Sequence, residues 1–268
     1  MPETWWRLGP EVLPGPAAVT RAIDLLDAGV ERPVLSWSLV TEPVLVAGRA
    51  APGAALNHHA LALDGVDVVQ RRSGGGPVLW GPELVSLDVC VPPAHRLAGH
   101  DVTLAYRWLG EAVSDALSAA GVPTHVVQID VARHHQSTDD PVRLRAARAC
   151  FGGLSPFEVV AEDGRKVVGL AQVRRRSGVL FQCGIALTFP SARLARYLES
   201  APSEIERMEA ALESVAAGLR DYRPELTVEA VIAAVEVSIA NREGITFDPM
   251  PAGAIPKHAP DPTETRSR

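Results

Sequence analysis

The spacing at which hydrophobic residues recur differs along the chain. In the middle of the chain they recur about every second residue. Apolar runs rich in Val, Ile and Leu, three to nine residues long and bounded by Gly, Pro or Asp, are typical of strands. The breaker Glu42-Pro43 separates the first two of these runs, and Glu162-Asp163-Gly164 indicates a hairpin between two later ones. We predict strands over residues 34–39, 44–48, 66–69, 78–80, 84–91, 124–129, 157–160, 166–170 and 179–187.

Helical periodicity marks both ends of the chain and one segment between the strands. Pro16 to Ala28 carries an apolar stripe and is followed by Gly29, a good helix terminator. Asp101 is a good N-cap for a helix over 102–120, and Ser203 with Glu206 forms a capping box for a helix to about residue 219. Further helices are predicted at about 54–64 and at 227–241.

These elements predict an α+β fold with a mixed, largely antiparallel sheet covered by helices. We expect one domain over 1–243, with a helical segment at about 191–243. The polar stretch 131–149 reads as an irregular loop. Residues 244–268 are rich in proline and polar side chains and predict a disordered tail.

Composition narrows the class of protein. Apolar residues make up 47% of the 268, enough for a real core, and the net charge of −6 argues against a general nucleic-acid or membrane-surface binder. The N-terminus lacks a basic region followed by an apolar segment, and no apolar run approaches the length of a membrane span. We therefore expect a cytoplasmic protein without a membrane or nucleic-acid partner.

Three cysteines and a histidine pair are the first candidates for chemistry. Cys90, Cys150 and Cys183 cannot all pair and show no CxxC spacing, which favours a reduced protein. Cys90 and Cys183 lie within predicted strands and read as core residues. His134 and His135 could hold a metal, but no third ligand stands at a recognisable spacing, so a solvated loop and no metal site are expected.

The stretch from Gln70 to Gly76 is the strongest candidate for a binding site. Three consecutive glycines let backbone N–H groups approach a ligand and form a concave anion site. Arg71 and Arg72 add planar, permanently charged forks. An ordinary hairpin loop with solvated arginines is the alternative. The later run 174–176, three arginines, is a solvated face or a surface for an acidic partner.

Two motifs resemble one known family. Arg71-Arg72-Ser73-Gly74-Gly75-Gly76 resembles the Arg-Arg-x-Ser/Thr-Gly-Gly-Gly signature of the lipoate–protein ligase and octanoyltransferase family, one residue shorter, so that Gln70 falls where the first arginine would be. Residues 166–172, Lys-Val-Val-Gly-Leu-Ala-Gln, are similar to its Lys-[Ile/Val]-x-Gly-x-Ala-Gln segment. The resemblance covers about 37–187 and, more loosely, reaches 243. It implies the biotin/lipoate-ligase catalytic fold related to class II aminoacyl-tRNA synthetases.

The resemblance also implies a set of site residues. Residues 150–158, Cys-Phe-Gly-Gly-Leu-Ser-Pro-Phe-Glu, are similar to the Cys-Phe-x-x-x-Ser-x-x-Glu segment of the cysteine-dependent octanoyltransferases, in which that cysteine forms an acyl-enzyme. Cys150 and Lys166 are then catalytic. The implied substrate- or acyl-adenylate-binding residues are Arg71, Ser73, Gly74, Gly75, Gly76, Val78, Gly169 and Ala171.

The chemistry of a thiol near an ammonium supports this assignment independently. The thiolate is the nucleophile, and a cation within reach of Cys150, such as Lys166, would favour it. Gly152 and Gly153 could present N–H groups to an oxyanion. A small buried cysteine at a loop edge is the alternative.

Three functions remain open at this point. An octanoyl- or lipoyltransferase would use no obligatory cofactor, with an acyl carrier protein as donor and a lipoyl domain or the glycine-cleavage H protein as acceptor. An ATP-dependent lipoate ligase would need ATP and Mg²⁺. Residues 80–84, Trp-Gly-Pro-Glu-Leu, replace the family ligases' aromatic-His-Asp-x-Gly-Asn segment, which favours the transferase. A non-catalytic binder of acyl groups or lipoyl domains is the third. Each requires an apolar tunnel, expected between strands 66–91 and 179–187.

Overall fold

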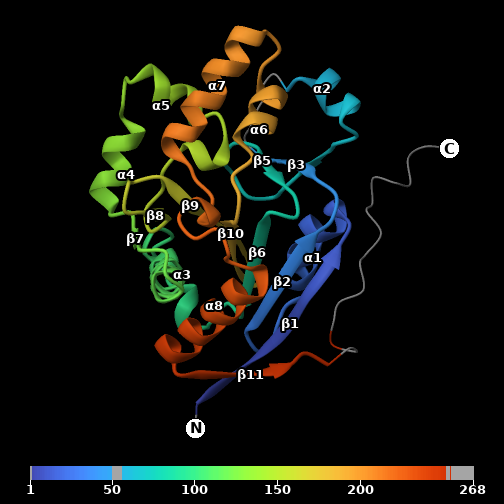
Figure 1. Ribbon diagram of the computed structural model, residues 1–268. Coiled ribbons are helices and arrows are strands. Elements are labelled where there is room, and N and C mark those ends of the chain that lie inside the picture. The colour runs from blue at the N-terminus through green and yellow to red at the C-terminus, as the bar shows by residue number, and fades with distance from the viewer. Residues whose placement is uncertain (1, 50–55, 252–253, 255–268) are drawn as a thin grey trace, which may run out of the picture.

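The computed structural model describes residues 2–49, 56–251 and 254, which form a large sheet, a small sheet and surrounding helices (Figure 1). β1 pairs in parallel with β11 and with β2, and all other neighbours in the large sheet are antiparallel. The predicted mixed, largely antiparallel sheet is therefore confirmed. Across the large sheet the strands are β11 (Ile245–Pro249), β1 (Glu3–Leu13), β2 (Val34–Val40), β6 (Leu84–Val91), β10 (Gly178–Ala186), β9 (Lys166–Arg175), β8 (Val159–Ala161) and β7 (Thr124–Val126).

The small sheet has the order β4 (Asp67–Gln70), β3 (Val44–Ala47) and β5 (Val78–Trp80). The α-helices are α1 (Gly15–Ala28), α2 (His58–Leu63), α3 (Arg107–Ala119), α4 (Ile129–Gln136), α5 (Pro141–Ala146), α6 (Ser191–Leu198), α7 (Pro202–Val215) and α8 (Val228–Glu243). Single 3₁₀ turns are η1 (Arg96–Ala98), η2 (Leu104–Tyr106), η3 (Cys150–Gly152) and η4 (Leu219–Asp221).

Helices cover the large sheet on both faces, so the central strands are buried throughout. Apolar residues of α3 and α8 pack on one face, and α1 packs on the other. Figure 1 shows α3 and α8 together in the lower part of the view, α6 and α7 in the upper part near the small sheet, and α4 and α5 at the upper left, with α4 beside β7 and β8. In β6, alternate residues serve the two faces: Leu87 and Val89 contact the α3–α8 layer, whereas Ser86 and Asp88 point the other way. This second face borders the cavity described below.

The predicted loop over 131–149 is wrong, because α4 and α5 occupy most of it. Asp140 caps α5 by accepting a hydrogen bond from the N–H of Val142 at 2.9 Å, and Pro141 stands at the first helical position. These helices bury few side chains, so their sequence lacks the apolar periodicity by which a helix is predicted. His135, predicted to be solvated, is buried on α4.

The predicted tail is wrong over Ile245–Pro249, which forms β11. Its partner is β1, which the sequence reading also missed, and Ile245 and Phe247 pack into the core beneath α8. β11 pairs with β1 alone in the described part of the chain, and the two strands come from opposite ends of the sequence. Of the remaining predicted tail, residues 252–253 and 255–268 lie outside the described part.

Several helix boundaries differ from prediction while the helices themselves are confirmed. α7 starts with Pro202 after Ala201 and ends at Val215, so the predicted capping box is absent from this helix, and α6 precedes it. The carboxylate of Asp101 accepts from the N–H groups of Thr103 and Leu104 and so caps a 3₁₀ turn; α3 begins only afterwards. The predicted strand at 124–129 ends at Val126, and residues 54–55 of the predicted 54–64 helix lie outside the described part.

Candidate functional site

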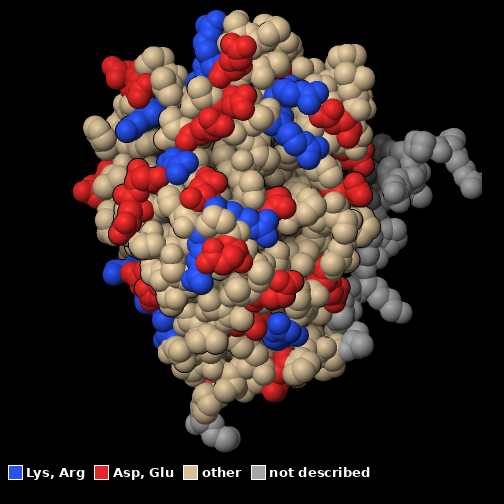
Figure 2. Space-filling model, in the orientation of Figure 1, with Lys and Arg blue, Asp and Glu red and all other residues tan. Residues whose placement is uncertain are grey.

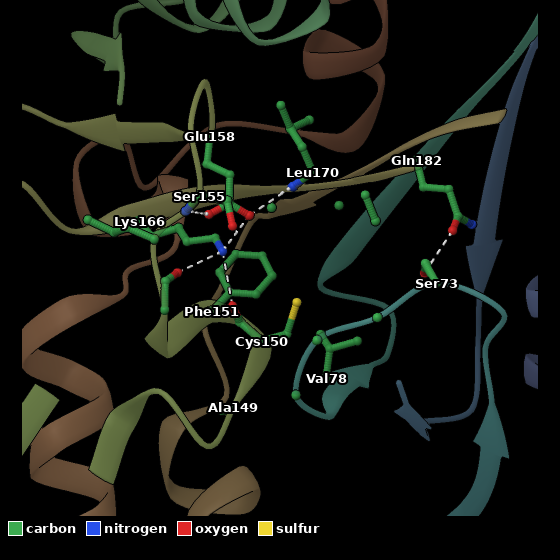
Figure 3. A pocket seen from close by; sticks show the side chains of 18 of the residues that line it. Ser73, Val78, Ala149, Cys150, Phe151, Ser155, Glu158, Lys166, Leu170 and Gln182 are labelled. Carbon is green, nitrogen blue, oxygen red and sulfur yellow. Dashed lines mark hydrogen bonds and ion pairs between the residues drawn. The ribbon is translucent and has the colours of Figure 1, made fainter. Parts of the chain in front are cut away.

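A cavity of about 510 Å³ lies between the glycine turn, the loop that carries Cys150 and the strands β9 and β10 (Figure 3). Among the residues that line it are all ten predicted site residues, from three stretches of the sequence: Arg71, Ser73, Gly74, Gly75, Gly76, Val78, Cys150, Lys166, Gly169 and Ala171. The fold therefore brings both family-like motifs and the cysteine segment to one place.

Arg71 organises the glycine turn from within. Its Nη2 donates to the carbonyl oxygen of Gly74 at 2.7 Å and to that of Gly76 at 3.2 Å, and it lies 3.6 Å from the sulfur of Cys150. Gly75 has φ +97°, and a Cβ there would lie 2.8 Å from the same nitrogen. Glycine is therefore favoured here by its backbone conformation, and a side chain would also displace the guanidinium from its present position.

The glycine turn and the cysteine loop touch through their backbones. A Cβ on Gly76 would lie 2.5 Å from the carbonyl oxygen of Arg148, and the N–H of Cys150 donates to the carbonyl oxygen of Pro77 at 2.9 Å. Side chains at this point would push the two segments apart. The close approach fixes the position of Cys150 relative to the turn.

A chain of buried polar groups supports the other end of the turn. Ser73 Oγ donates to Gln182 Oε1 at 3.1 Å, and Gln182 Nε2 donates to Asp88 Oδ1 at 3.2 Å. Burial raises the pKa of Asp88 to about 7, against the opposing effects of the Gln182 hydrogen bond and of Arg21. The chain fixes the orientation of the Gln182 amide, which sequence reasoning had not singled out.

Lys166 is buried, and its ammonium donates to or pairs with three oxygens. It lies 2.7 Å from Glu158 Oε1 and donates to the carbonyl oxygens of Cys150 and Gly153 at 3.0 Å each. Glu158 also accepts from the N–H groups of Ser155 and Leu170. An ammonium has three N–H donors, so these contacts satisfy it fully. Lys166 thus ties the cysteine loop to β9.

Composition underlines the need for an ammonium at this position. Lysine occurs in the sequence at positions 166 and 257 alone, and the rest of the 26 lysine and arginine residues are arginine. A compact ammonium suits three convergent oxygens in a buried site, whereas a planar guanidinium does not.

The apolar part of the cavity matches the expected tunnel only in part. Val78, Trp80 and Leu84 come from the first predicted range, but the second contributes Gln182, Cys183 and Gly184. Val19 of α1 and Val46 of β3 complete the apolar wall. The sequence did not identify these two residues, because the apolar patterns of their helix and strand are those of ordinary core residues.

The polar end of the cavity comes from a region that the sequence reading had taken for a loop. The residues there are His135, Gln136, Thr138 and Arg143, and Tyr106 of η2 joins them from outside that region. Burial lowers the pKa of His135, and the positive charges of Arg143 and Lys166 and the neighbouring His134 act in the same direction. Its imidazole is accordingly held neutral.

The other two cysteines are buried, as predicted. Burial, with the nearby Asp88 carboxylate, raises the pKa of Cys90 to about 12 and that of Cys183 still further. Cys150 is partly exposed and its sulfur borders the cavity. Among residues 2–49 and 56–251, no three His, Cys, Asp or Glu side chains are grouped so that they could hold a metal ion.

The surface around the molecule carries both signs of charge. Blue and red side chains are interspersed over the face shown in Figure 2, and near the cysteine loop Arg145 pairs with Glu204 at 2.6 Å and Arg148 with Glu199. Arg174, considered as a docking residue, instead donates to the carbonyl oxygens of Ala98 and Gly99 and holds that loop. No helix in the described part of the chain is long and apolar enough to cross a membrane.

Comparison with solved structures shows the fold. A lipoate-protein ligase A bound with ATP superposes with a TM-score of 0.69 at 17% identity, covering 93% of this chain and 91% of the other. A bi-partite lipoate protein ligase from Thermoplasma acidophilum gives a TM-score of 0.71 at 15% identity, with 94% and 89% covered.

Comparison with known sequences extends this result. An octanoyltransferase LipM of Kyrpidia tusciae is 32% identical over 206 residues, which cover 66% of this chain and 72% of that protein. An octanoyltransferase LipM of an Exiguobacterium species is 27% identical over 196 residues, covering 73% and 69%. The family model for the lipoyl protein ligase A/B catalytic domain matches residues 22–240. With the fold, the two motifs and the cavity agreeing, the chain belongs to the lipoyl protein ligase A/B catalytic domain family.

Proposed function

We propose that this protein is an acyltransferase that moves an octanoyl group through a Cys150 thioester to a lysine of a lipoyl-carrier domain. One observation carries the cysteine assignment: of three cysteines, Cys150 is the partly exposed one, and its sulfur borders the cavity beside the glycine turn. The similarity to proteins named octanoyltransferase LipM supports the choice of acyl group.

The chemistry proceeds in two balanced steps. The thiolate of Cys150 attacks the donor thioester carbonyl; a new C–S bond forms, the donor's C–S bond breaks, and the donor sulfur leaves and takes up a proton. The acceptor amine then attacks the acyl-enzyme; a C–N bond forms, and Cys150 regains a proton as its thioester bond breaks. A thioester is already activated, so this route uses no ATP.

The glycine turn supplies candidate donors for the oxyanion in both steps. The N–H groups of Gly74, Gly75 and Gly76 donate to no other described residue, and all three glycines line the cavity. Backbone N–H groups fixed before the reaction stabilise negative charge effectively because they need no reorganisation. Lys166 holds the loop so that Cys150 stays opposite these donors.

The apolar wall suits a medium-length acyl chain. An octanoyl group offers about seven methylene or methyl groups, and their burial contributes roughly 5–6 kcal/mol at about 0.8 kcal/mol each. Val19, Val46, Val78, Trp80 and Leu84 provide that environment.

The partners follow from the same chemistry. We propose an acyl carrier protein as the thioester donor and a lipoyl domain, or the glycine-cleavage H protein, as the acceptor. The ligase alternative is supported by similarity in fold to a lipoate-protein ligase A bound with ATP. It would use ATP and Mg²⁺, and Trp80 to Leu84 stand where its usual polar segment would be.

The proposed function is tested by an acyl-transfer assay. Octanoyl carrier protein and a lipoyl domain are incubated with the wild type and with Cys150→Ala, each with and without ATP and Mg²⁺. The transferase gives octanoylated domain without ATP, and Cys150→Ala loses it. Activity that needs ATP and survives in Cys150→Ala supports the ligase, and a lipoyl domain that binds but stays unmodified in every mixture supports a non-catalytic binder.

A further inference from the structure

Two cations approach Cys150, and they contact different parts of it. Arg71 Nη2 lies 3.6 Å from the sulfur, whereas Lys166 Nζ donates to the backbone carbonyl oxygen at 3.0 Å. Figure 3 shows the Lys166 ammonium directed at carbonyl oxygens and Glu158, while the Cys150 sulfur points into the cavity. The sequence led us to expect Lys166 beside the Cys150 sulfur, but the cation there is Arg71.

The charge of Lys166 is compensated close by. Glu158 Oε1 stands 2.7 Å from the ammonium, and both side chains are almost fully buried. Opposite charges this close form a dipole whose field falls off faster with distance than that of a single charge. Lys166 consequently does little for a thiolate whose sulfur it does not contact.

The charge of Arg71 is not compensated in the same way. In the described part of the chain its guanidinium pairs with no carboxylate; it donates to the carbonyl oxygens of Gly74 and Gly76. These neutral acceptors fix the group without cancelling its charge, and a guanidinium stays charged across the whole working pH range. The turn thus holds a full positive charge against the sulfur.

We propose that Arg71 is a catalytic residue that stabilises the Cys150 thiolate, with the carbonyl oxygens of the glycine turn holding its guanidinium in place. This inference rests on the proposed role of Cys150. In forming the thiolate, the thiol gives its proton to solvent. The other ionisable groups that line the cavity are Tyr106, His135, Arg143, Glu158, Lys166 and Cys183; Arg71 is the one whose side chain contacts the sulfur in the described part of the chain.

The test measures the rate of Cys150 alkylation by iodoacetamide, without acyl donor, at pH 7 and at pH 10. Arg71→Gln is compared with Arg72→Gln, which removes an equal charge from the next, exposed residue. We expect the rate of Arg71→Gln to fall about tenfold at pH 7 but by less than twofold at pH 10, a pH above the ordinary thiol pKa of about 8.5. Arg72→Gln should match the wild type at both. Equal rates for Arg71→Gln and wild type at pH 7 would overturn the inference.

Arg71→Lys distinguishes an effect of the positive charge from an effect of the turn's geometry. It also provides the test if Arg71→Gln does not fold. It keeps the positive charge, so its rate at pH 7 should stay within about threefold of the wild type. A tenfold loss at both pH values in this variant would show that the sulfur responds to a displaced turn and would overturn the inference. Failure of the proposed function is seen separately, as absence of acylated Cys150 in the wild type after exposure to octanoyl carrier protein.

Discussion

The two faces of the large sheet use the same strands for opposite purposes. On the α3–α8 face, alternate residues such as Leu35, Trp37 and Leu87 pack into one apolar cluster. On the other face, their neighbours are polar: Ser36 pairs across strands with Asp88, and both are buried. Successive residues of a strand point to opposite faces, so each strand contributes side chains both to the apolar cluster under α3 and α8 and to the face that borders the cavity.

This difference shows that the cavity face, unlike the α3–α8 face, carries the desolvation cost of buried polar groups. Buried polar groups contribute little or even destabilise unless they are fully paired. On the cavity face they are paired through specific chains, Ser73–Gln182–Asp88 and Lys166–Glu158, which position the turn and the cysteine loop. Substitutions on the two faces should therefore fail in different ways.

Breaking the buried ion pair should have the largest effect. Lys166→Met removes the counter-ion of the buried Glu158 carboxylate, which costs about 3–5 kcal/mol of unfolding free energy. It also frees the carbonyl oxygens of Cys150 and Gly153. Urea denaturation measures the loss, and a Lys166→Met, Glu158→Leu double variant should recover part of it. Unchanged stability of the single variant would contradict this account of the pair.

Asp88 should make stability depend on pH in the direction opposite to an ordinary paired carboxylate. Its pKa is raised to about 7 in the folded protein, against about 3.9 when unfolded. Between these values the native state holds a proton that the unfolded state has lost, so unfolding free energy falls as pH rises, by up to about 4 kcal/mol.

Asp88→Asn keeps an oxygen acceptor for Gln182 and removes this titration. Urea denaturation from pH 4 to pH 8 should show the variant gaining on the wild type as pH rises through that window, with the largest gain at and above pH 7. Parallel pH profiles would rule out a proton held by Asp88.

A matched pair of leucines compares the faces directly. Leu87→Ala on the helix-covered face should cost about 3 kcal/mol through cavity formation, with transfer activity kept while the protein remains folded. Leu84→Ala borders an existing cavity and should cost less stability, but it should weaken binding of the octanoyl chain. Denaturation and KM for octanoyl donor distinguish them, and the reverse ranking of stability would contradict the division of the faces.

The smallest effects concern two glycines of the site. Gly76→Ala places a Cβ 2.5 Å from the Arg148 carbonyl oxygen and should cost about 1–3 kcal/mol as the turn and cysteine loop separate. At Gly169 the nearest atom would be Lys166 Cε at 3.5 Å, an ordinary contact, so Gly169→Ala should change stability by less than about 1 kcal/mol. Thermal unfolding of both variants checks the order.

The sequence alone was sufficient for the parts of the fold with strong local signals. The strands around β6 and β10 and the helix α1 were predicted because apolar periodicity and terminators coincide there. The ten site residues were found because two motifs and the cysteine segment resemble one family. They all line one cavity, and their roles as site residues stay predictions.

What the sequence could not show depends on distant contacts. β11 lies at the sheet edge through its pairing with β1 at the opposite end of the chain, and β1 is held between β11 and β2. Lys166 contacts carbonyl oxygens rather than the sulfur because of how Glu158 and the cysteine loop pack. Residue spacing in the sequence carries no information about this packing. For the same reason the position of Arg71 beside Cys150 emerged only with the fold.

The most direct test of the central claim is the intact mass of the protein after brief exposure to octanoyl carrier protein without ATP. The account predicts a covalent adduct of one octanoyl group, mapped by peptide mass to Cys150, that disappears when a lipoyl domain is added and reappears on that domain. An unmodified protein together with octanoylated domain formed only in the presence of ATP would contradict it.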